Sequence, residues 1–354
     1  MSTNVIIVND RASYADAVKK AATVIESGGI AAIPTETVYG LAVSAEHASA
    51  VERLRAVKGR PEEKKFTICV PLKTDVARFV AFMPRTAEKL INAFWPGPLT
   101  LVLPSKSGGT VGIRMPGLSI TRDILLKTDT TVLIPSANPS DLEPAVTAGQ
   151  VLEYFDGKID LVVDAGPSPM RVASTVVEVT AEGAVRVLRK GAIDEEEIKR
   201  AIVHTVLIVC TGNLCRSPMA AGLAAKYLAE RLGVDIDRLD KAGYRVISAG
   251  TAALDGTPAS PDAVEVMREI GIDITGHRSR ALTVSLERDA DDIYVMSPHH
   301  LDAVKEIDWD AASRAKLISP YGSEIQDPIG MPRNVYRRVR DELRDAILKR
   351  PEEI

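Results

Sequence analysis

The sequence predicts an α/β protein built from two units. Apolar runs of strand length alternate with amphipathic segments of helix length along the chain, which is typical of layered α/β folds. A length of 354 residues favours two or three domains at about 150 residues each. The acidic stretch "GAIDEEEIKRAIVH" at 191–204 is expected to form a short helix that closes the first unit. We therefore predict one domain over residues 1–203 and a second over residues 204–354.

The elements of the first unit follow from apolar runs and the signals at their ends. A helix is expected over 13–26, with Ser13 as its N-cap and Gly28 and Gly29 ending it. A second helix over 48–58 ends at "KGRP". The strands expected in this unit cover residues 5–8, 30–34, 66–71, 99–103, 132–135, 160–164, 174–179 and 185–188.

The second unit alternates more regularly. Its expected strands cover 206–210, 245–248, 292–296 and 316–318, and its expected helices cover 218–231, 260–270, 299–305 and 332–349. Strands that alternate with helices at this spacing form a parallel sheet with helices on both faces. We therefore predict a doubly wound parallel sheet for this unit.

The composition excludes several classes of protein. The apolar fraction of 45% and the charged fraction of 26% are ordinary for globular proteins, and the net charge of −4 gives no overall basic surface for nucleic acid, although a local basic cleft stays open. No apolar run reaches the ~20 residues that cross a bilayer, and "MSTNVIIVND" lacks the pattern of a signal peptide. Three cysteines cannot form a disulfide framework, and the odd number favours a reducing compartment. We expect a soluble, cytoplasmic protein without membrane contact.

The stretch "VLIVCTGNLCRSP" places a cysteine at the end of a buried strand. A buried cysteine is usually only a small apolar side chain. Here Cys210 and Arg216 frame a C-x5-R loop in front of a helix, so that the backbone N–H groups of the loop can form a cradle for an anion. Arg216 can hold two phosphate oxygens, and the same positive surroundings favour a thiolate at Cys210. This pattern predicts a nucleophile for phosphoryl transfer.

A proton donor for the leaving group is expected on a late loop. Asp327 stands before a proline in "QDPIG". An Asp-Pro pair alone usually marks only a turn, and Asp327 becomes a candidate proton donor because the chain also carries the C-x5-R loop. In order, "VCTGNLCRSPMA", "ISAGTAALDGTPASPDAV", "GIDITGHRSRAL", "ADDIYVMSPHH" and "DPIG" resemble the low-molecular-weight protein-tyrosine-phosphatase family, which includes protein-arginine phosphatases. The resemblance covers about residues 204–350.

The phosphatase resemblance implies a role for each residue of the loop. Cys210 would be the nucleophile, Arg216 the phosphate binder and Asp327 the general acid, without a cofactor. The supporting residues of the loop would be Thr211, Gly212, Asn213, Leu214, Cys215 and Ser217. Ser217 would donate a hydrogen bond to the thiolate, and Asn213 would brace the loop together with His277.

Two questions about the phosphatase stay open from the sequence. Leu214 stands where arginine phosphatases have threonine, and Ile329 follows the proline where aromatic residues often flank a phenyl ring, whereas the "CTGN" start resembles the arginine-phosphatase branch. The phosphoprotein substrate therefore carries phosphotyrosine or phosphoarginine. Cys215 can protect Cys210 as a reversible disulfide or can be a plain buried thiol.

The first unit carries a scattered set of cations and hydroxyls. Residues 1–200 contain neither "GxxxxGK[ST]" nor a "GxGxxG" after a strand. Cationic residues at the ends of apolar segments suit a polyphosphate. In order, "IPTETVYGLA", "VKGRP", "FWPGPLTLVLP", "TVGIRMPG", "PSAN", "ASTVVEV" and "VLRKGAI" resemble the threonylcarbamoyl-AMP synthase family over about residues 8–200.

The synthase resemblance implies a twisted, mixed α/β sheet with a concave cleft. The implied reaction joins L-threonine, bicarbonate and ATP, with Mg²⁺, into threonylcarbamoyl-AMP and pyrophosphate for the modification of adenosine 37 in tRNA. The partners would be tRNA or tRNA-modification proteins. The residues implied for ATP are Lys58, Arg60, Ser136, Asn138, Thr147 and Arg189, and those for threonine are Thr35, Arg114 and Ser174. No side-chain metal site is expected.

Three hypotheses for the whole chain follow. The first is a bifunctional enzyme. The second is an active phosphatase whose front half only binds RNA or a nucleotide, since the implied cleft is basic. The third is a regulatory scaffold with an inactive phosphatase, and the intact Cys210, Arg216, Ser217 and Asp327 argue against it.

Overall fold

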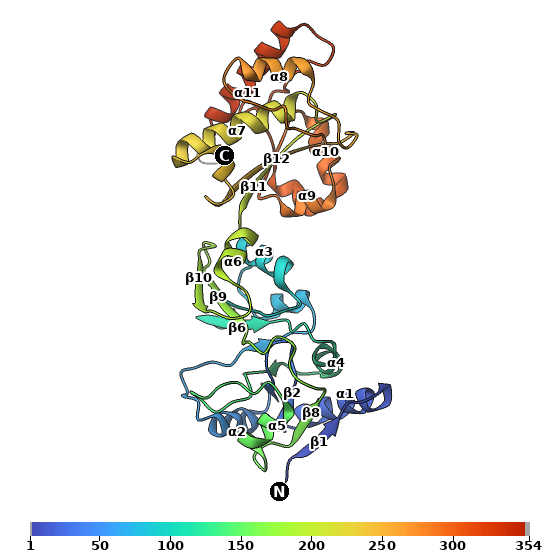
Figure 1. Cartoon of the computed structure of the whole chain (residues 1–354), viewed down its shortest axis with the longest axis vertical. Helices are drawn as coiled ribbons and strands as arrows, with labels where there is room; N and C mark the ends of the chain where they lie inside the picture. Colours follow the sequence, from blue (N-terminus) through green and yellow to red (C-terminus); the bar gives the residue numbers. More distant parts are fainter. Residues whose placement is uncertain (1, 351–354) are drawn as a thin grey trace. The chain divides into compact units, whose positions relative to one another are not determined.

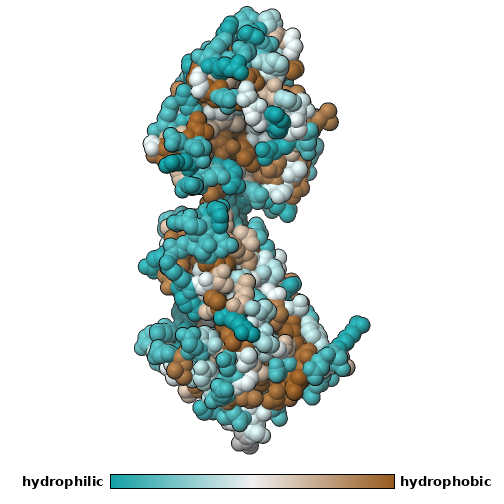
Figure 2. All heavy atoms as spheres, in the orientation of Figure 1, coloured by the Kyte–Doolittle hydropathy of each residue, from teal (hydrophilic) through white to brown (hydrophobic). Residues whose placement is uncertain are grey.

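The structure is a computed structural model that describes residues 2–350 (Figure 1). The chain forms two compact units that divide between Ala201 and Ile202. In the described residues no helix is both long enough and apolar enough to cross a membrane. On the face seen in Figure 2, hydrophilic and hydrophobic residues are interspersed over each unit.

The first unit contains a ten-stranded mixed sheet in the order β1-β8-β2-β3-β7-β4-β6-β5-β9-β10. The strands are β1 (Asn4–Ile7), β2 (Ala31–Ile33), β3 (Gly40–Ser44), β4 (Ile68–Cys69), β5 (Leu99–Pro104), β6 (Thr110–Arg114), β7 (Val132–Leu133), β8 (Leu161–Asp164), β9 (Thr175–Val179) and β10 (Val185–Arg189). Parallel pairs such as β1 with β8 and β5 with β9 lie in the same sheet as antiparallel pairs such as β2 with β3. The mixed sheet expected for this unit is confirmed.

Helices pack on both faces of this sheet. They are α1 (Arg11–Glu26), α2 (Ala48–Lys58), α3 (Arg85–Phe94), α4 (Ser119–Lys127), α5 (Ala148–Phe155) and α6 (Glu195–Ala201), with a 3-10 turn η1 (Lys73–Arg78). Successive residues of a strand point to opposite faces, so Leu41 and Val43 join a core with α2 and α5, whereas Ala42 joins a core with α1 and α4. β3 is therefore buried on both sides.

The start of α1 differs from the prediction. Asp10, not Ser13, is the N-cap: its carboxylate accepts the Ser13 N–H at 2.7 Å, while the Ser13 hydroxyl accepts the Asp10 N–H at 3.0 Å. Both residues belong to one capping box, and the aspartate three positions earlier satisfies the first free N–H groups of the helix. Gly28, with φ of +80°, follows the C-cap.

The second unit contains a four-stranded parallel sheet in the order β12-β11-β13-β14. Its strands are β11 (His204–Cys210), β12 (Tyr244–Gly250), β13 (Asp292–Val295) and β14 (Ala315–Leu317), and its helices are α7 (Arg216–Leu232), α8 (Pro261–Arg268), α9 (Val284–Asp289), α10 (Pro298–Ile307) and α11 (Arg333–Leu348), with 3-10 turns η2 (Ile236–Arg238) and η3 (Trp309–Arg314). α7, α8 and α11 cover one face, and α9 and α10 cover the other (Figure 1). The predicted doubly wound parallel sheet is confirmed.

The order of the strands in this sheet indicates which edge of the sheet is expected to bind a ligand. The chain passes from β11 to β12 on one side and then returns to β13 on the other side of β11. Ligands of open parallel sheets bind at the carboxyl ends of the strands where this reversal occurs. Cys210 is the last residue of β11 and so lies at that edge.

Glu287 on α9 is a carboxylic acid buried in the second unit. The residue is 0% exposed, and neither carboxyl oxygen has a hydrogen-bond partner in the described part of the chain. Burial, aided by the charge of Asp308 and opposed by that of Arg314, raises the pKa of Glu287 to about 7. The folded protein therefore prefers this carboxyl in its protonated form.

We expect Glu287→Gln to stabilise the protein at alkaline pH. The folded carboxyl keeps its proton up to about pH 7 whereas the ordinary pKa is 4.5, so wild-type stability falls as pH rises between these values. The gain from the substitution should reach about 3 kcal/mol at pH 8 and vanish near pH 4.5. Urea unfolding at both pH values measures it, with the exposed Glu306→Gln as the control. An equal effect at both pH values would contradict the assignment.

Candidate active sites

The loop after β11 surrounds the thiol of Cys210 with hydrogen-bond donors. The Asn213 N–H donates to Cys210 Sγ at 3.2 Å, and Ser217 Oγ lies 2.9 Å from the same sulfur. The Asn213 side-chain amide donates to Ser217 Oγ at 2.8 Å, so the Ser217 hydroxyl gives its own hydrogen to another acceptor. Cys210 Sγ at 2.9 Å is nearer than the alternative, the Ala249 carbonyl oxygen at 3.5 Å. Two hydrogen-bond donors thus converge on the sulfur of Cys210.

Asn213 ties this loop to its neighbours. Its φ of +54° lies in the left-handed region that asparagine tolerates better than most residues. Its amide donates to Ser248 Oγ at 2.9 Å, its side-chain oxygen accepts the Arg280 N–H at 2.9 Å, and its carbonyl oxygen lies 2.7 Å from His277 Nε2. Burial lowers the pKa of His277, so the neutral ring donates from Nε2. These contacts hold the backbone of the loop in one shape.

The end of β12 passes very close to the loop. A Cβ built on Gly250 would stand 2.5 Å from the Thr211 carbonyl oxygen and 2.9 Å from the Asn213 backbone nitrogen. Only glycine fits there. By contrast, a Cβ on Gly212 would meet nothing closer than the Leu214 side chain at 3.8 Å. Sequence reasoning missed Gly250, because the close approach joins segments about 40 residues apart.

Arg216 and Asp327 meet across the sheet edge. The buried guanidinium donates from Nη1 to the Ile325 carbonyl at 3.1 Å and from Nη2 to Thr211 Oγ1 at 3.3 Å, and Nη2 also pairs with the Asp327 carboxylate. Arg216 Nε is buried and finds no hydrogen-bond partner within residues 2–350. Because buried donors are normally paired, an anion held in the loop would supply the missing acceptor.

Leu214 and Cys215 lie on the same loop, where Leu214 is half-buried and Cys215 is buried. Both pack against the core that α7, α8 and α11 share. Cys215 Sγ lies 3.2 Å from Ser260 Oγ and 3.6 Å from the Tyr336 hydroxyl. Burial raises the pKa of the Cys215 thiol. These surroundings favour a buried, protonated thiol at Cys215, and the disulfide with Cys210 stays a prediction.

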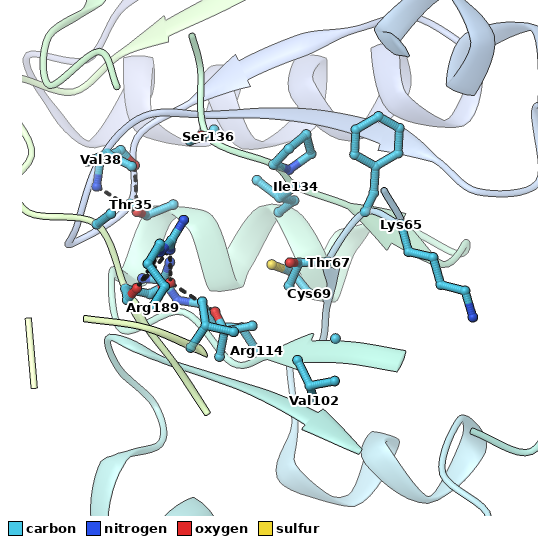
Figure 3. Close-up of a pocket in the computed structure, with 18 of the residues that line it drawn as sticks. Thr35, Val38, Lys65, Thr67, Cys69, Val102, Arg114, Ile134, Ser136 and Arg189 are labelled. Atoms are coloured by element: carbon cyan, nitrogen blue, oxygen red, sulfur yellow. Dashed lines mark hydrogen bonds between the residues drawn. The ribbon is translucent and has the colours of Figure 1, made fainter. Parts of the chain in front are cut away.

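The first unit contains a cavity of about 450 Å³ (Figure 3). The predicted residues that line it are Thr35, Arg60, Arg114, Ser136, Ser174 and Arg189. The other three predicted residues, Lys58, Asn138 and Thr147, are not in its lining. Lys65, Phe66 and Thr67 do line it, although the sequence analysis singled out none of them.

Lys58 does not line the cavity but contacts the backbone of a segment that does. Its ammonium group is buried, with the residue 3% exposed, and donates to the carbonyl oxygens of Ser136 and Asn138, each at 2.5 Å. Burial and the charge of Arg60 lower the pKa of Lys58 to about 8. The lysine therefore holds the "PSAN" turn in place instead of reaching into the cavity.

Asn138 and Thr147 are likewise part of the supporting structure. Asn138 accepts the Ser136 hydroxyl at 2.5 Å and donates to the Leu142 carbonyl at 2.7 Å. Thr147 is the N-cap of α5 and accepts the Gln150 N–H at 3.2 Å. Both residues fix the 136–147 segment beside the cavity.

Arginine side chains concentrate positive charge in the cavity. Burial and the nearby charges of Arg114 and Arg60 lower the pKa of Arg189, because both positive groups disfavour a further positive charge there. Arg189 donates to the Ser174 carbonyl at 2.7 Å, and Arg60 donates to the Lys65 carbonyl at 2.8 Å. Such a set suits a ligand with several negative charges.

Among the residues that the structure describes, Arg114 is the one of these three with a carboxylate partner. Its Nη2 lies 2.6 Å from Glu36 Oε1 and 2.9 Å from Thr37 Oγ1. Thr35 Oγ1 donates to the Val38 carbonyl at 2.6 Å, so its hydroxyl holds the turn that carries Thr37 (Figure 3). Sequence reasoning missed Glu36, because its partner is 78 residues away.

Two family models match the chain, one over each unit. Sua5_yciO_yrdC, described as telomere recombination, matches residues 23–191, and LMWPc, described as low molecular weight phosphotyrosine protein phosphatase, matches residues 205–353. A threonylcarbamoyl-AMP synthase of Halorhodospira halophila is 36% identical over 155 residues, which cover 41% of this chain and 81% of the relative. The first unit belongs to the threonylcarbamoyl-AMP synthase family. The second unit is a low-molecular-weight phosphatase domain, so the predicted fusion is confirmed.

A longer relative matches this chain over part of its own length. The threonylcarbamoyl-AMP synthase of Pyrococcus abyssi is 37% identical over 207 residues, 56% of this chain and 61% of the relative. The chain thus spans less than two thirds of that protein. The crystal structure of P. abyssi Sua5 complexed with L-threonine matches with a TM-score of 0.53 and 26% identity, covering 70% of this chain and 92% of that one.

Proposed function

We propose that the chain is a bifunctional enzyme. The synthase-family unit would make threonylcarbamoyl-AMP from L-threonine, bicarbonate and ATP, and the phosphatase domain would hydrolyse a phosphorylated protein through a phosphocysteine. The arginine-lined cavity is the observation that supports the first activity. The donors gathered on Cys210 Sγ beside a buried arginine support the second.

In the synthase reaction the chain would act mainly by positioning and by neutralising charge. Arg60 and Arg189 would hold the phosphates of ATP, while Thr35, Arg114 and Ser174 would hold threonine, the amino acid bound in the P. abyssi structure. Carbamate formation and adenylation need aligned reactants more than a covalent nucleophile. The product would serve modification of adenosine 37 in tRNA, with tRNA or tRNA-modification proteins as partners.

Mg²⁺ is the proposed companion of ATP. In the described residues no three His, Cys, Asp or Glu side chains come together as a metal site, and Glu63 is the one carboxylate residue that lines the cavity. This donor set fits an ion held largely by phosphate oxygens and water, as Mg²⁺ often is. When bound, the ion would neutralise phosphate charge.

In the phosphatase reaction Cys210 would attack phosphorus. The S–P bond forms as the bond to the leaving group breaks, and the leaving atom takes a proton from Asp327. Arg216 and the backbone N–H groups of the loop hold the phosphate oxygens meanwhile. Asp327 then takes a proton from water, whose oxygen attacks phosphorus and releases phosphate, so that the thiolate returns.

Omission of single reactants tests the synthase activity. Pyrophosphate release from ATP should require threonine and bicarbonate together. Pyrophosphate release at the same rate with and without threonine would favour the second hypothesis, in which this unit only binds a nucleotide or RNA in its cationic cavity.

We expect the wild type to hydrolyse phosphotyrosine esters at least as well as phosphoarginine, and Leu214→Thr to shift the preference roughly tenfold toward phosphoarginine. Leu214 is half-buried and offers only apolar contact at the loop. An unpaired guanidinium against apolar groups loses about 1–3 kcal/mol. The values of kcat/KM for both substrates measure the ratio. A wild type that strongly prefers phosphoarginine would show that Leu214 does not filter the substrate.

A further inference from the structure

A buried histidine supports the phosphate loop from the opposite face of the sheet. His300 lies on α10 and is 0% exposed. Its Nε2 lies 3.0 Å from Thr211 Oγ1, and its Nδ1 lies 2.6 Å from Ser297 Oγ. Thr211 in turn lies 3.3 Å from Nη2 of Arg216. His300 is thus one side chain away from the proposed phosphate binder.

The direction of these hydrogen bonds is fixed by the arginine. A guanidinium can only donate, so Thr211 Oγ1 accepts from Arg216 and must give its own hydrogen to another acceptor. The Nε2 of His300 is an acceptor within reach, which requires the tautomer with its hydrogen on Nδ1. That hydrogen is donated to Ser297 Oγ, and Ser297 can then donate to a ring nitrogen of His299 at 2.9 Å.

The surroundings keep the ring neutral. Burial, with smaller effects from the charges of His299 and Arg216, lowers the pKa of His300 to about 4. A protonated ring would place a second cation near Arg216. Its Nε2 would also carry a hydrogen and could no longer accept the hydrogen of the Thr211 hydroxyl. The neutral tautomer is therefore the form that the bonded chain requires.

Arg216 needs this support because Asp327, its carboxylate partner, is also the proposed general acid. Nη2 is shared between Thr211 and the Asp327 carboxylate. In the proposed reaction Asp327 gives a proton to the leaving group, so its pairing with Arg216 changes during turnover. Within residues 2–350, Thr211 and the Ile325 carbonyl on Nη1 are the remaining hydrogen-bond partners of the guanidinium.

We propose that His300 is a positioning residue for the phosphatase, which holds the Thr211 hydroxyl in the orientation that fixes the Arg216 guanidinium for phosphate. The inference rests on the proposed phosphatase function. His300 belongs to the "MSPHH" motif and lies 84 positions after Arg216 in the sequence.

Binding of inorganic phosphate to the full chain tests the proposal without relying on turnover. His300→Leu keeps the volume and removes the acceptor, Thr211→Val removes the hydroxyl, and His300→Gln restores an acceptor oxygen near the place of Nε2. Titration calorimetry should show phosphate affinity about tenfold weaker in the first two variants. Their double variant should be no weaker than either, because both act through one chain of bonds. His300→Gln should recover most of the affinity.

The outcomes separate the two levels of the proposal. Additive losses in the double variant, unchanged affinity in Thr211→Val, or no recovery in His300→Gln would overturn the role of His300. If His300→Leu fails to fold, Thr211→Val and His300→Gln still decide, since neither leaves a large cavity. The proposed phosphatase function fails on a different result, namely a wild type that binds phosphate but hydrolyses neither an aryl phosphate nor phosphoarginine.

Discussion

Cys210→Ser is expected to lower phosphatase turnover by on the order of 10⁴-fold or more. A serine hydroxyl keeps its proton at neutral pH, so the donors of Asn213 and Ser217 would surround a weak nucleophile instead of a thiolate. Hydrolysis of an aryl phosphate measures the loss. The geometry of the loop should survive, because sulfur and oxygen occupy similar positions.

Cys215→Ser is the matched control for this variant. It makes the same substitution five positions later, at a buried thiol that contacts Ser260 and Tyr336. We expect it to keep activity within a few-fold under reducing conditions. A folded Cys210→Ser protein with substantial turnover would remove this cysteine from the chemistry.

Arg60→Ala is expected to lower threonine-dependent pyrophosphate release by roughly 10²–10³-fold, the usual effect of removing one electrostatic contact to the transition state. Arg60 lines the cavity and is held by the backbone carbonyls of Lys64 and Lys65. Initial rates at varied ATP measure the effect. Arg53→Ala is the control, because Arg53 lies on α2 and pairs with Asp160, and it does not line the cavity.

Lys58→Ala should also reduce this rate strongly, but for another reason. The variant would leave the carbonyl oxygens of Ser136 and Asn138 without their shared donor, so the turn beside the cavity would lose its shape. Thermal unfolding should therefore show a lower Tm for Lys58→Ala, whereas Arg60→Ala should leave Tm nearly unchanged. Unchanged rates in both variants would exclude this cavity as the synthase site.

The local part of the phosphatase loop could be predicted from the sequence. Cys210, Asn213, Arg216 and Ser217 lie within eight positions at a strand end, so their spacing alone places them around one anion. Asp327 could be found only by the resemblance of its motif. His300 and Gly250 could not be found, since their contacts with the loop arise from strand order and not from spacing.

The first unit was harder to predict because its contacts are long-range and its strands short. The strand expected over 66–71 pairs only at Ile68–Cys69, and β3 and β6 were not expected at all. The burial of Lys58 overrides the usual exposure of a lysine, because two carbonyl oxygens about 80 residues away receive its hydrogens. The alternation of apolar runs still gave the correct fold class, since each sheet is covered on both faces.

Both activities measured on one preparation of the full chain test the central claim most directly. Wild type, Cys210→Ser and Arg60→Ala would each be assayed for aryl phosphate hydrolysis and for threonine- and bicarbonate-dependent pyrophosphate release. We predict that the wild type performs both, that Cys210→Ser loses only the first, and that Arg60→Ala loses only the second. A wild type that lacks either activity, or a folded variant that loses both, would contradict the account.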